Sequence, residues 1–501
     1  MNFFKRKLAL ITVIVLSIVA FLALFYFDKA LLIGLFLIIS LTAITFLILY
    51  KLKVGNKTLY LLFLITLFIH LGVALFFHYT QFQPLGGGGG DFIIYQQIAE
   101  EVAQRINQGV YSLEGLNSPH YYPVLIGIIY ALTLPEIIIG ELFSVWLVAI
   151  AVLFVYLIVV EIGGSKKWAF LIGLIVSIYP SYLYFGSVLL KDTVIIPLVL
   201  SGMLLSIRMM KVFSWQKFFI FYIILTALIH FRFYVGYAVL FSFIICWFLI
   251  SSFKIKKRIV FGVVIVYLLG FSPQLLGYGY YGTKPLKYYL TPEVITVYRE
   301  VVYAPPPAPT TTAPTAAAPV AEAPTTGAPT TGAPTTEAPT TPPPPPPPGL
   351  GSSFVVETGF DSPFKFIKNS LESFICSLLG PFPWQIKYKR QFFSLLEVIP
   401  WYLFFYIIIQ GIYKFVITNG WKRTLQHYKF TLPLLMFSIM ALGALSLFIN
   451  NFGIITRIRI PSFIALLCLI IFNEDIDKKL NKLSKYYYEK KFIKFPNLSD
   501  L

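Results

Sequence analysis

Acidic residues and cysteines are both scarce in this sequence. Only 22 of its 501 residues are Asp or Glu, and all charged residues together make up 12% of the chain. A soluble globular domain carries about twice that charged fraction, so a water-soluble enzyme is excluded. Cys246, Cys376 and Cys468 lie in or beside apolar segments and have no metal-ligand spacing. Neither a disulfide framework nor a zinc site is therefore expected.

Apolar residues dominate the chain instead. Hydrophobic residues make up 57% of it, and the mean hydropathy is +0.78. Apolar runs of about 20 residues recur, a length that crosses a bilayer as an α-helix, and they predict an all-α polytopic membrane protein with about 12–13 transmembrane helices. The expected spans cover residues 8–27, 30–50, 59–79, 137–160, 168–190, 192–210, 218–231, 233–253, 259–276, 396–418, 430–450 and 460–473. The apolar stretch 121–134 is too short to cross comfortably, and we expect it to be re-entrant or displaced.

The formal net charge is +18, and the basic residues cluster in short loops between the apolar runs. Such clusters mark the cytoplasmic side of a membrane protein, so we interpret the charge as topology and expect no nucleic-acid partner. Lys5–Lys7, Arg208–Lys217 and Lys254–Arg258 define that side. The loops that carry Asp91 and Lys191 then emerge on the opposite, external side, and membrane lipids surround the spans.

The sequence divides into five parts. These are an N-terminal transmembrane hairpin (1–58), a transmembrane core (59–276) whose first external loop covers 80–120, an external segment (277–395), C-terminal transmembrane helices (396–473) and a basic cytoplasmic tail (474–501). Within the external segment, the Ala, Pro and Thr tract 304–349 cannot bury apolar area and predicts a disordered insertion. Start signals at Thr291–Glu293 and Asp361–Pro363, with a stop at Gly380–Pro381, predict two interfacial helices.

Five consecutive glycines, Gly86–Gly90, precede Asp91 in the first external loop. They place no side chain in the way of a ligand and allow backbone angles closed to other residues. After Asp91, apolar residues recur every three or four positions as far as Gly109, which predicts an amphipathic helix along the membrane surface. Asp91 is a candidate catalytic base, with an N-cap of this helix as the structural alternative.

Charged residues at the ends of later spans are further candidates. Lys191 and Asp192 separate two expected spans, a depth at which charge is costly and commonly marks a site. A lysine suits a phosphate, and the aspartate can orient it. Arg232, Arg457 and Arg459 lie on the external side, against the positive-inside bias, and a guanidinium binds phosphate through a fork of donors. Boundary marking and interfacial snorkelling are the alternatives.

The order of these residues resembles a known family. The sequence Gly89–Asp91 before an amphipathic helix, then Tyr122-Pro123, Pro180-Ser181 and Leu190–Asp192, is similar to the GT-C superfamily of polyprenyl-phosphate-sugar glycosyltransferases. Bacterial members similar to protein mannosyltransferases and to the lipid A aminoarabinose transferase are the nearest. The likeness covers about residues 60–250. Five glycines in place of one or two, and the Pro/Thr tract, depart from the family pattern.

The resemblance implies a GT-C-like helix bundle in which the acidic residue of the first external loop is catalytic, matching Asp91, and a second acidic position matches Asp192. It also implies inverting transfer from a polyprenyl-phosphate-linked sugar to a glycan, lipid or protein acceptor, outside the bacterial cytoplasmic membrane. Some members use a divalent cation, but no ligand cluster in this sequence predicts one. Possible pocket residues are Tyr95, His120 and Tyr122, with a purely structural role for His120 as the alternative.

Two other functions stay open. A polysaccharide repeat-unit polymerase would depend on Arg232, Arg457 and Arg459 more than on Asp91. A transporter or flippase for lipid-linked sugars would show internal repeats and polar residues at mid-membrane. The two halves of this sequence show no repeat, and the polar residues gather at one side, so the transporter is the weaker of the two.

Overall fold

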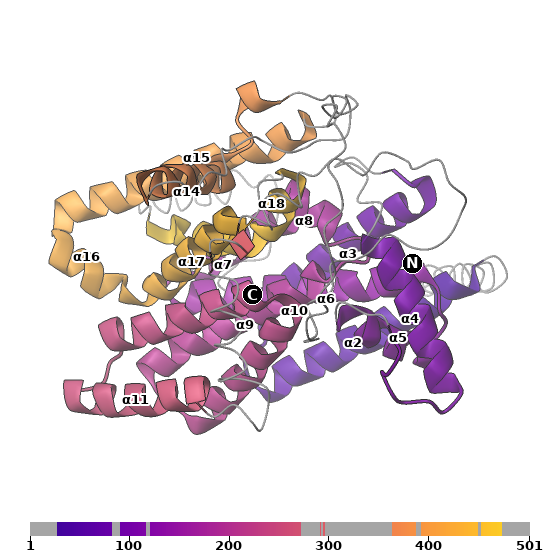
Figure 1. Ribbon diagram of the computed structural model, residues 1–501. Coiled ribbons are helices and arrows are strands. Elements are labelled where there is room, and N and C mark those ends of the chain that lie inside the picture. The colour runs from indigo at the N-terminus through magenta and orange to yellow at the C-terminus, as the bar shows by residue number, and fades with distance from the viewer. Residues whose placement is uncertain are drawn as a thin grey trace, which may run out of the picture.

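The computed structural model describes residues 28–82, 91–116, 121–271, 291, 294–295, 363–386, 392–448 and 452–472. In these ranges every regular element is a helix, as Figure 1 shows. Seven of the described helices are long and apolar enough to cross a membrane. The predicted all-α, polytopic membrane fold is therefore confirmed. The expected span 8–27, the tract 304–349, the tail 474–501 and most of the helix start at Thr291–Glu293 lie outside the described residues.

Seven helices form the membrane-spanning set. They are α2 (Lys29–Lys51), α3 (Lys57–Thr80), α6 (Ile137–Glu161), α9 (Asp192–Lys211), α10 (Trp215–Ile250), α15 (Phe392–Asn419) and α17 (Leu432–Phe448). Helix α6 is apolar on nearly all sides, as is typical of a helix enclosed by others, and most of its residues are buried. It packs against α2, α3, α7 (Lys166–Ser177) and α9. The bundle is thus built around α6.

Helix α10 is a hairpin and not one long rod. The rings of Phe221 and Phe243 are in contact, with centroids 4.7 Å apart, whereas 22 residues of straight helix would separate them by about 33 Å. The reversal lies at Arg232, whose backbone is non-helical (φ −160°, ψ 92°). Gly236 makes the tight fold possible, because a Cβ there would approach the backbone of Ile229 to 3.1 Å. The two spans expected on either side of Arg232 are confirmed.

Helix α9 runs from one end of the bundle to the other and so shows which charged residues lie at each end. It begins at Asp192, and about 24–29 Å along its axis Arg208 and Lys211 each lie 2.8 Å from the carboxylate of Glu161 at the end of α6. The basic cluster that the sequence assigns to the cytoplasmic side is therefore at the opposite end of the bundle from Asp192. Arg232, at the turn of α10, lies at the Asp192 end.

The single span expected over 168–190 is wrong. Helix α7 ends at Ser177, and a short helix, α8 (Pro180–Phe185), follows it. Proline disfavours helical geometry in the preceding residue, and Tyr179 is accordingly extended (ψ 123°). Residues 186–191 have no helix, yet Ser187 and Leu189 are fully buried. Irregular backbone at this depth is tolerated when protein surrounds it.

The loop over 80–120, which the sequence predicts to be external, folds as predicted in its described part. Helix α4 (Asp91–Asn107) buries Tyr95, Ala99 and Val102 on one face, and Gly109 after it adopts a left-handed φ of +78°. Helix α5 (Tyr122–Leu132) packs against α4. Its 11 residues rise about 16 Å, too little to cross a bilayer, in agreement with the expected displaced or re-entrant piece.

The remaining elements are short. They are α11 (Ile255–Phe271), α14 (Pro363–Leu379), η1 (Pro383–Gln385), α16 (Trp421–His427), η3 (Lys429–Thr431), α18 (Phe452–Ile458), α19 (Ile460–Leu467) and η4 (Cys468–Phe472). Helix α14 begins at the predicted Pro363 and ends before Gly380, which confirms both signals. It packs on α17 and α15, and its outer stripe of Phe364, Ile367 and Leu371 is exposed, as suits contact with lipid.

Candidate functional site

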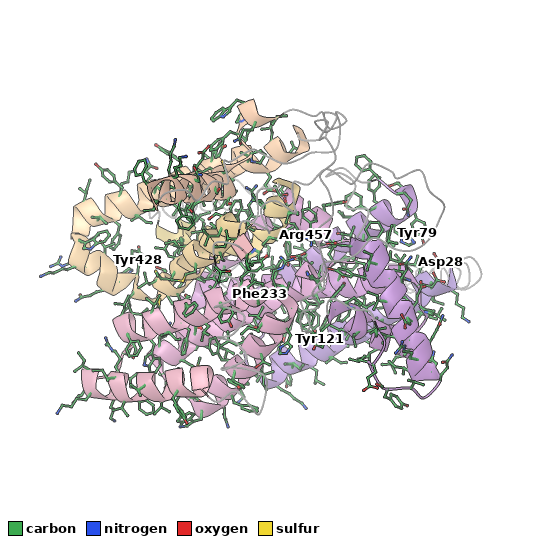
Figure 2. All side chains as sticks on the ribbon, in the orientation of Figure 1. Asp28, Tyr79, Tyr121, Phe233, Tyr428 and Arg457 are labelled. Carbon is green, nitrogen blue, oxygen red and sulfur yellow. The ribbon has the colours of Figure 1, made fainter. Side chains whose placement is uncertain are left out.

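Four of the residues expected in the site form one chain of ion pairs. Arg457 Nη1 lies 2.8 Å from Asp91 Oδ2, and Arg457 Nε lies 2.9 Å from Asp192 Oδ2. Arg232 Nη1 donates to Asp192 Oδ1 at 2.7 Å. Figure 2 labels Arg457 near the middle of the molecule, where the C-terminal helices meet the first half of the chain. Two carboxylates from distant segments therefore share one guanidinium.

Local structure explains why each side chain points to this place. Asp91 and Asp192 each open a helix, α4 and α9, where a carboxylate is favoured by the positive end of the helix dipole. Arg232 occupies the reversal of α10, so its side chain leaves the tip of the hairpin. Arg457 is in the last turn of α18, which contacts α8 next to the loop that leads to Asp192.

The two carboxylates differ in burial. The side chain of Asp192 is only 5% exposed, and both arginines bind it, whereas that of Asp91 is 46% exposed. Asp192 is thus a fixed counter-charge that holds Arg232 and Arg457 in place. Asp91 is the carboxylate of the two that is accessible from solvent.

Cations outnumber carboxylates in this cluster. Lys191, Arg232 and Arg457 face Asp91 and Asp192, so one positive charge is left over when all three are protonated. Burial, and then the nearby guanidinium of Arg232, lower the pKa of Lys191 to about 7. Although burial opposes it, Asp192 and Asp91 raise the pKa of Arg457 above its ordinary value, so this side chain stays charged. A centre of this kind suits an anionic ligand.

Arg459 does not join this cluster. Its side chain is 1% exposed, and its Nη2 lies 2.9 Å from Glu397 Oε1 on α15. Its Nη1 donates to the backbone carbonyls of Ser377 and Gly380 at the end of α14, and its guanidinium lies 4.5 Å from the ring centroid of Phe463. These contacts engage both terminal nitrogens of the guanidinium within the described fold. Arg459 therefore ties α14, α15 and α19 together, two residues beyond Arg457.

The two tyrosines expected in the pocket are support and not pocket wall. The rings of Tyr95 and Tyr122 pack edge to face with centroids 5.4 Å apart, and Tyr122 is fully buried. The hydroxyl of Tyr122 is 3.5 Å from Ser144 Oγ, to which Thr193 beside Asp192 also donates. Tyr122 thus links α5, through Ser144 of α6, to the start of α9, and Tyr95 packs α4 on α5. His120 and Gly86–Gly90 lie outside the described residues.

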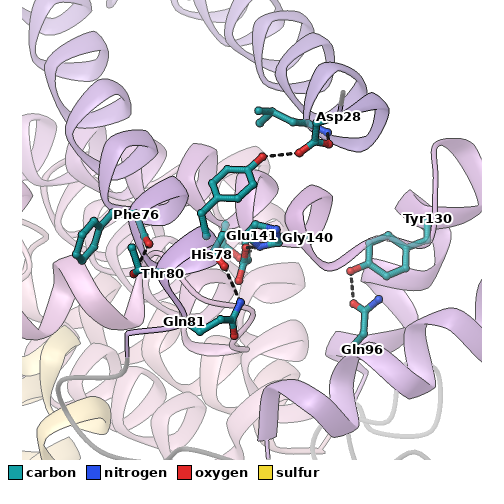
Figure 3. A network of polar contacts seen from close by, with 12 residues as sticks. Asp28, Phe76, His78, Thr80, Gln81, Gln96, Tyr130, Gly140 and Glu141 are labelled. Atoms are coloured by element: carbon teal, nitrogen blue, oxygen red, sulfur yellow. Dashed lines mark hydrogen bonds and ion pairs between the residues drawn. The ribbon is translucent and has the colours of Figure 1, made fainter. Parts of the chain in front are cut away.

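A pocket adjoins the ion-pair chain. Its lining consists of Phe77, His78, Gln81, Phe82, Phe92, Ile137, Glu141, Tyr184, Phe185, Val188, Leu190 and Arg457. His78 and Glu141 form an ion pair in its wall, with Nδ1 and Oε2 2.8 Å apart, and Figure 3 shows them close to Gln81. Sequence reasoning missed both residues. The signal was present, because Glu141 is a carboxylate inside the expected span 137–160, where charge is costly.

An apolar groove continues from this pocket. It runs between α3, α8 and α15 and is lined by Ile69, Gly72, Val73, Phe76, Phe77, Phe82, Pro180, Leu183, Tyr184 and Leu396. Phe77, Phe82 and Tyr184 line both spaces. Phe76 and Leu396 are more than half exposed on the outer surface of apolar helices, where lipid would lie. The groove thus connects the lipid-facing surface with the pocket that contains His78, Glu141 and Arg457.

Comparisons with models of protein families, with curated proteins and with solved structures found no match.

Among the described residues, no group of three or more His, Cys, Asp or Glu side chains is arranged to hold a metal ion. Asp91 and Asp192 converge on a guanidinium and not on a common cation position. The side chains of the described residues therefore do not fit the divalent cation that some GT-C members use.

Proposed function

We propose that this chain is a membrane glycosyltransferase. It would move a sugar from a polyprenyl-phosphate-linked donor to a glycan, lipid or protein acceptor at the external face of a bacterial cytoplasmic membrane. One observation carries the proposal: two helix-opening carboxylates share Arg457 beside a pocket whose wall holds His78 and Glu141 among apolar side chains and which continues into an apolar groove on the lipid-facing surface. A lipid-linked sugar has the same sequence of parts, an apolar chain, an anionic link and a polar head.

The geometry assigns a role to each part of the site. The apolar groove takes the first isoprene units of the donor, and the excess positive charge of Lys191, Arg232 and Arg457 attracts its phosphate. The acceptor hydroxyl attacks the anomeric carbon, the bond from that carbon to the phosphate oxygen breaks, and polyprenyl phosphate leaves. The proton of the hydroxyl passes to the accessible carboxylate of Asp91. Asp192 stays ionised and holds the arginines.

The test of Asp91 is the Asp91→Asn variant, assayed by transfer of labelled sugar from lipid-linked donor in membranes of the producing strain. We expect a loss of roughly two or more orders of magnitude, as for removal of a general base. The control is Glu101→Gln on the same helix, whose carboxylate pairs with Arg105 on the exposed face. Near-normal transfer by Asp91→Asn would remove Asp91 from the mechanism.

The test of the groove uses two glycines. A Cβ on Gly72 of α3 or on Gly443 of α17 would meet no atom within 4 Å, and only Gly72 lines the groove. We expect Gly72→Trp to fill the groove and raise the apparent KM for the lipid-linked donor about tenfold or more, the cost of losing contact with roughly two buried CH₂ groups. Gly443→Trp should leave it unchanged. Equal effects of the two variants would show that the groove does not hold the donor.

The polymerase alternative receives less support from the structure. It depends on three external arginines acting together, and Arg459 is enclosed with Glu397 away from the pocket. Of the three, only Arg232 and Arg457 belong to the ion-pair chain around Asp192, so the three arginines do not form one group. Asp91, on which the transferase depends, is the exposed member of the chain.

A further inference from the structure

The pair formed by His78 and Glu141 has no part in the mechanism above. His78 is in the last turn of α3, and Glu141, 7% exposed, is in the second turn of α6. Both belong to helices that are otherwise strongly apolar. Charged groups in such helices are costly and are found where they serve a ligand or a proton. The pair lines the same pocket as Arg457.

The hydrogen bond to Glu141 leaves one ring nitrogen of His78 available. Nδ1 is engaged at 2.8 Å, and Nε2 makes no hydrogen bond within the part of the chain that the structure describes. The side chain is 21% exposed and lies in the pocket wall. A carboxylate on one imidazole nitrogen fixes the orientation of the ring and the use of the other nitrogen. Nε2 is therefore positioned to meet a ligand in the pocket.

Three carboxylates from neighbouring elements lie close enough to His78 to act on its charge. Glu141 on α6 is bonded to it, Glu136 precedes α6, and Asp28 precedes α2 and accepts a hydrogen bond from Tyr79. All three are carboxylates, so a proton on Nε2 is balanced by charge within the protein. An Nε2–H with a carboxylate behind it is a charge-assisted donor for an anion.

The place of His78 indicates which anion it meets. It follows Phe77 in the chain, and Phe77 lines both the apolar groove and the pocket. Arg457 lines the same pocket and links it to the Asp91–Asp192 pair. The head group of an amphiphile whose chain lies in the groove enters the pocket at this junction.

We propose that His78, held by Glu141, binds the phosphate of an isoprenyl phosphate together with Arg457. The class of ligand rests on the proposed function, whereas the assignment of His78 rests on the pocket. In the transfer reaction, Nε2–H donates a hydrogen bond to the phosphate oxygen that leaves the sugar and so stabilises its developing charge. Glu141 is a positioning residue for the ring.

The test compares two probes on the full-length protein in detergent micelles, by titration calorimetry. Farnesyl phosphate and farnesol share the same chain and differ in the phosphate. The His78→Asn amide reproduces Nδ1 and can still bond Glu141, but it lacks Nε2. His78→Gln reproduces Nε2 and loses Nδ1. The control is His427→Asn on α16, an exposed histidine that stacks on Phe415 outside the pocket.

We expect His78→Asn to weaken farnesyl phosphate about tenfold or more, the effect of losing one hydrogen bond to a charged group, while farnesol changes less than about twofold. His78→Gln should retain part of the preference for the phosphate, and His427→Asn all of it. Glu141→Gln should weaken farnesyl phosphate by an intermediate factor without an effect on farnesol. Loss of both probes to the same extent would show that the ring is structural and overturn the proposal.

The outcomes separate this proposal from the proposed function. If the unaltered protein does not prefer farnesyl phosphate to farnesol, the lipid-phosphate donor fails and the assignment of His78 falls with it. If the preference exists and both His78 variants keep it, only the assignment of His78 fails. If inorganic phosphate binds as tightly as farnesyl phosphate, the ligand is a free phosphate and the isoprenyl part of the proposal is overturned.

Discussion

Replacing Asp192 with Asn would remove one negative charge from between two guanidinium groups while keeping the shape of the side chain. The side chains of Asp192 and Arg232 are 5% and 6% exposed, so the charge left on Arg232 would have little access to solvent. Removal of one partner from a buried ion pair costs about 3–5 kcal/mol of unfolding free energy. The exposed Asp91 forms a pair worth about 0–1 kcal/mol. We therefore expect Asp192→Asn to be several times more destabilising than Asp91→Asn, although both carboxylates bind Arg457.

The unfolding free energy can be measured by SDS titration in mixed micelles with tryptophan fluorescence as the signal. A third variant, Asp192→Asn with Arg232→Met, removes the orphaned charge as well and should recover at least about 1 kcal/mol relative to Asp192→Asn alone. Equal losses for the two single variants, or a double variant less stable than Asp192→Asn, would refute the view of Asp192 as the buried counter-charge of the site.

Three further predictions use the same titration. In Arg459→Lys, the lysine cannot reach both Glu397 and the carbonyl of Gly380, so we expect the unfolding free energy to fall by about 1–3 kcal/mol while the affinity for farnesyl phosphate is unchanged. Weaker ligand binding at unchanged stability would show that Arg459 belongs to the binding site. The pKa of Lys191 is about 7 in the folded protein and about 10.5 in the unfolded chain, so the unfolded chain binds more protons between these pH values. The unfolding free energy should therefore rise by about 1.5 kcal/mol from about pH 7 to about pH 8.5. Lys191→Met should abolish this rise, and an unchanged rise would assign it to other groups. Deletion of 304–348 should leave the protein inserted and folded, as judged by its yield in membranes and its unfolding midpoint, and loss of the protein would show that the tract is structural.

The features of the fold that the sequence predicts correctly are those that depend on local pattern. The three-to-four spacing after Asp91 predicts α4, and Arg232 between two apolar runs predicts the reversal of α10. The break after Ser177 was missed because average hydropathy does not register the constraint of Pro180 on the backbone of Tyr179. Local pattern therefore predicts most helices but not the irregular backbone between them.

The candidate site shows the same division. Sequence alone identifies four of the site residues, because a charge at the end of an apolar run is costly and commonly marks a functional site. These are Asp91, Asp192, Arg232 and Arg457. Which of these side chains pair with one another cannot be predicted from the sequence. Arg459, two residues after Arg457, is also a charge at the end of an apolar run, yet it pairs with Glu397. Which guanidinium meets the pocket is decided by the turn between α18 and α19, a tertiary feature.

The bond between Arg457 and Asp91 joins residues separated by 366 positions. Because the chain is synthesised from its N-terminus, Asp91, Asp192 and Arg232 leave the ribosome long before Arg457 has been translated. Until that moment the growing chain has no guanidinium to bridge the carboxylates of Asp91 and Asp192. Under the proposed function, catalytic competence would therefore be a property of the late nascent chain, because the site is complete only once Arg457 is present.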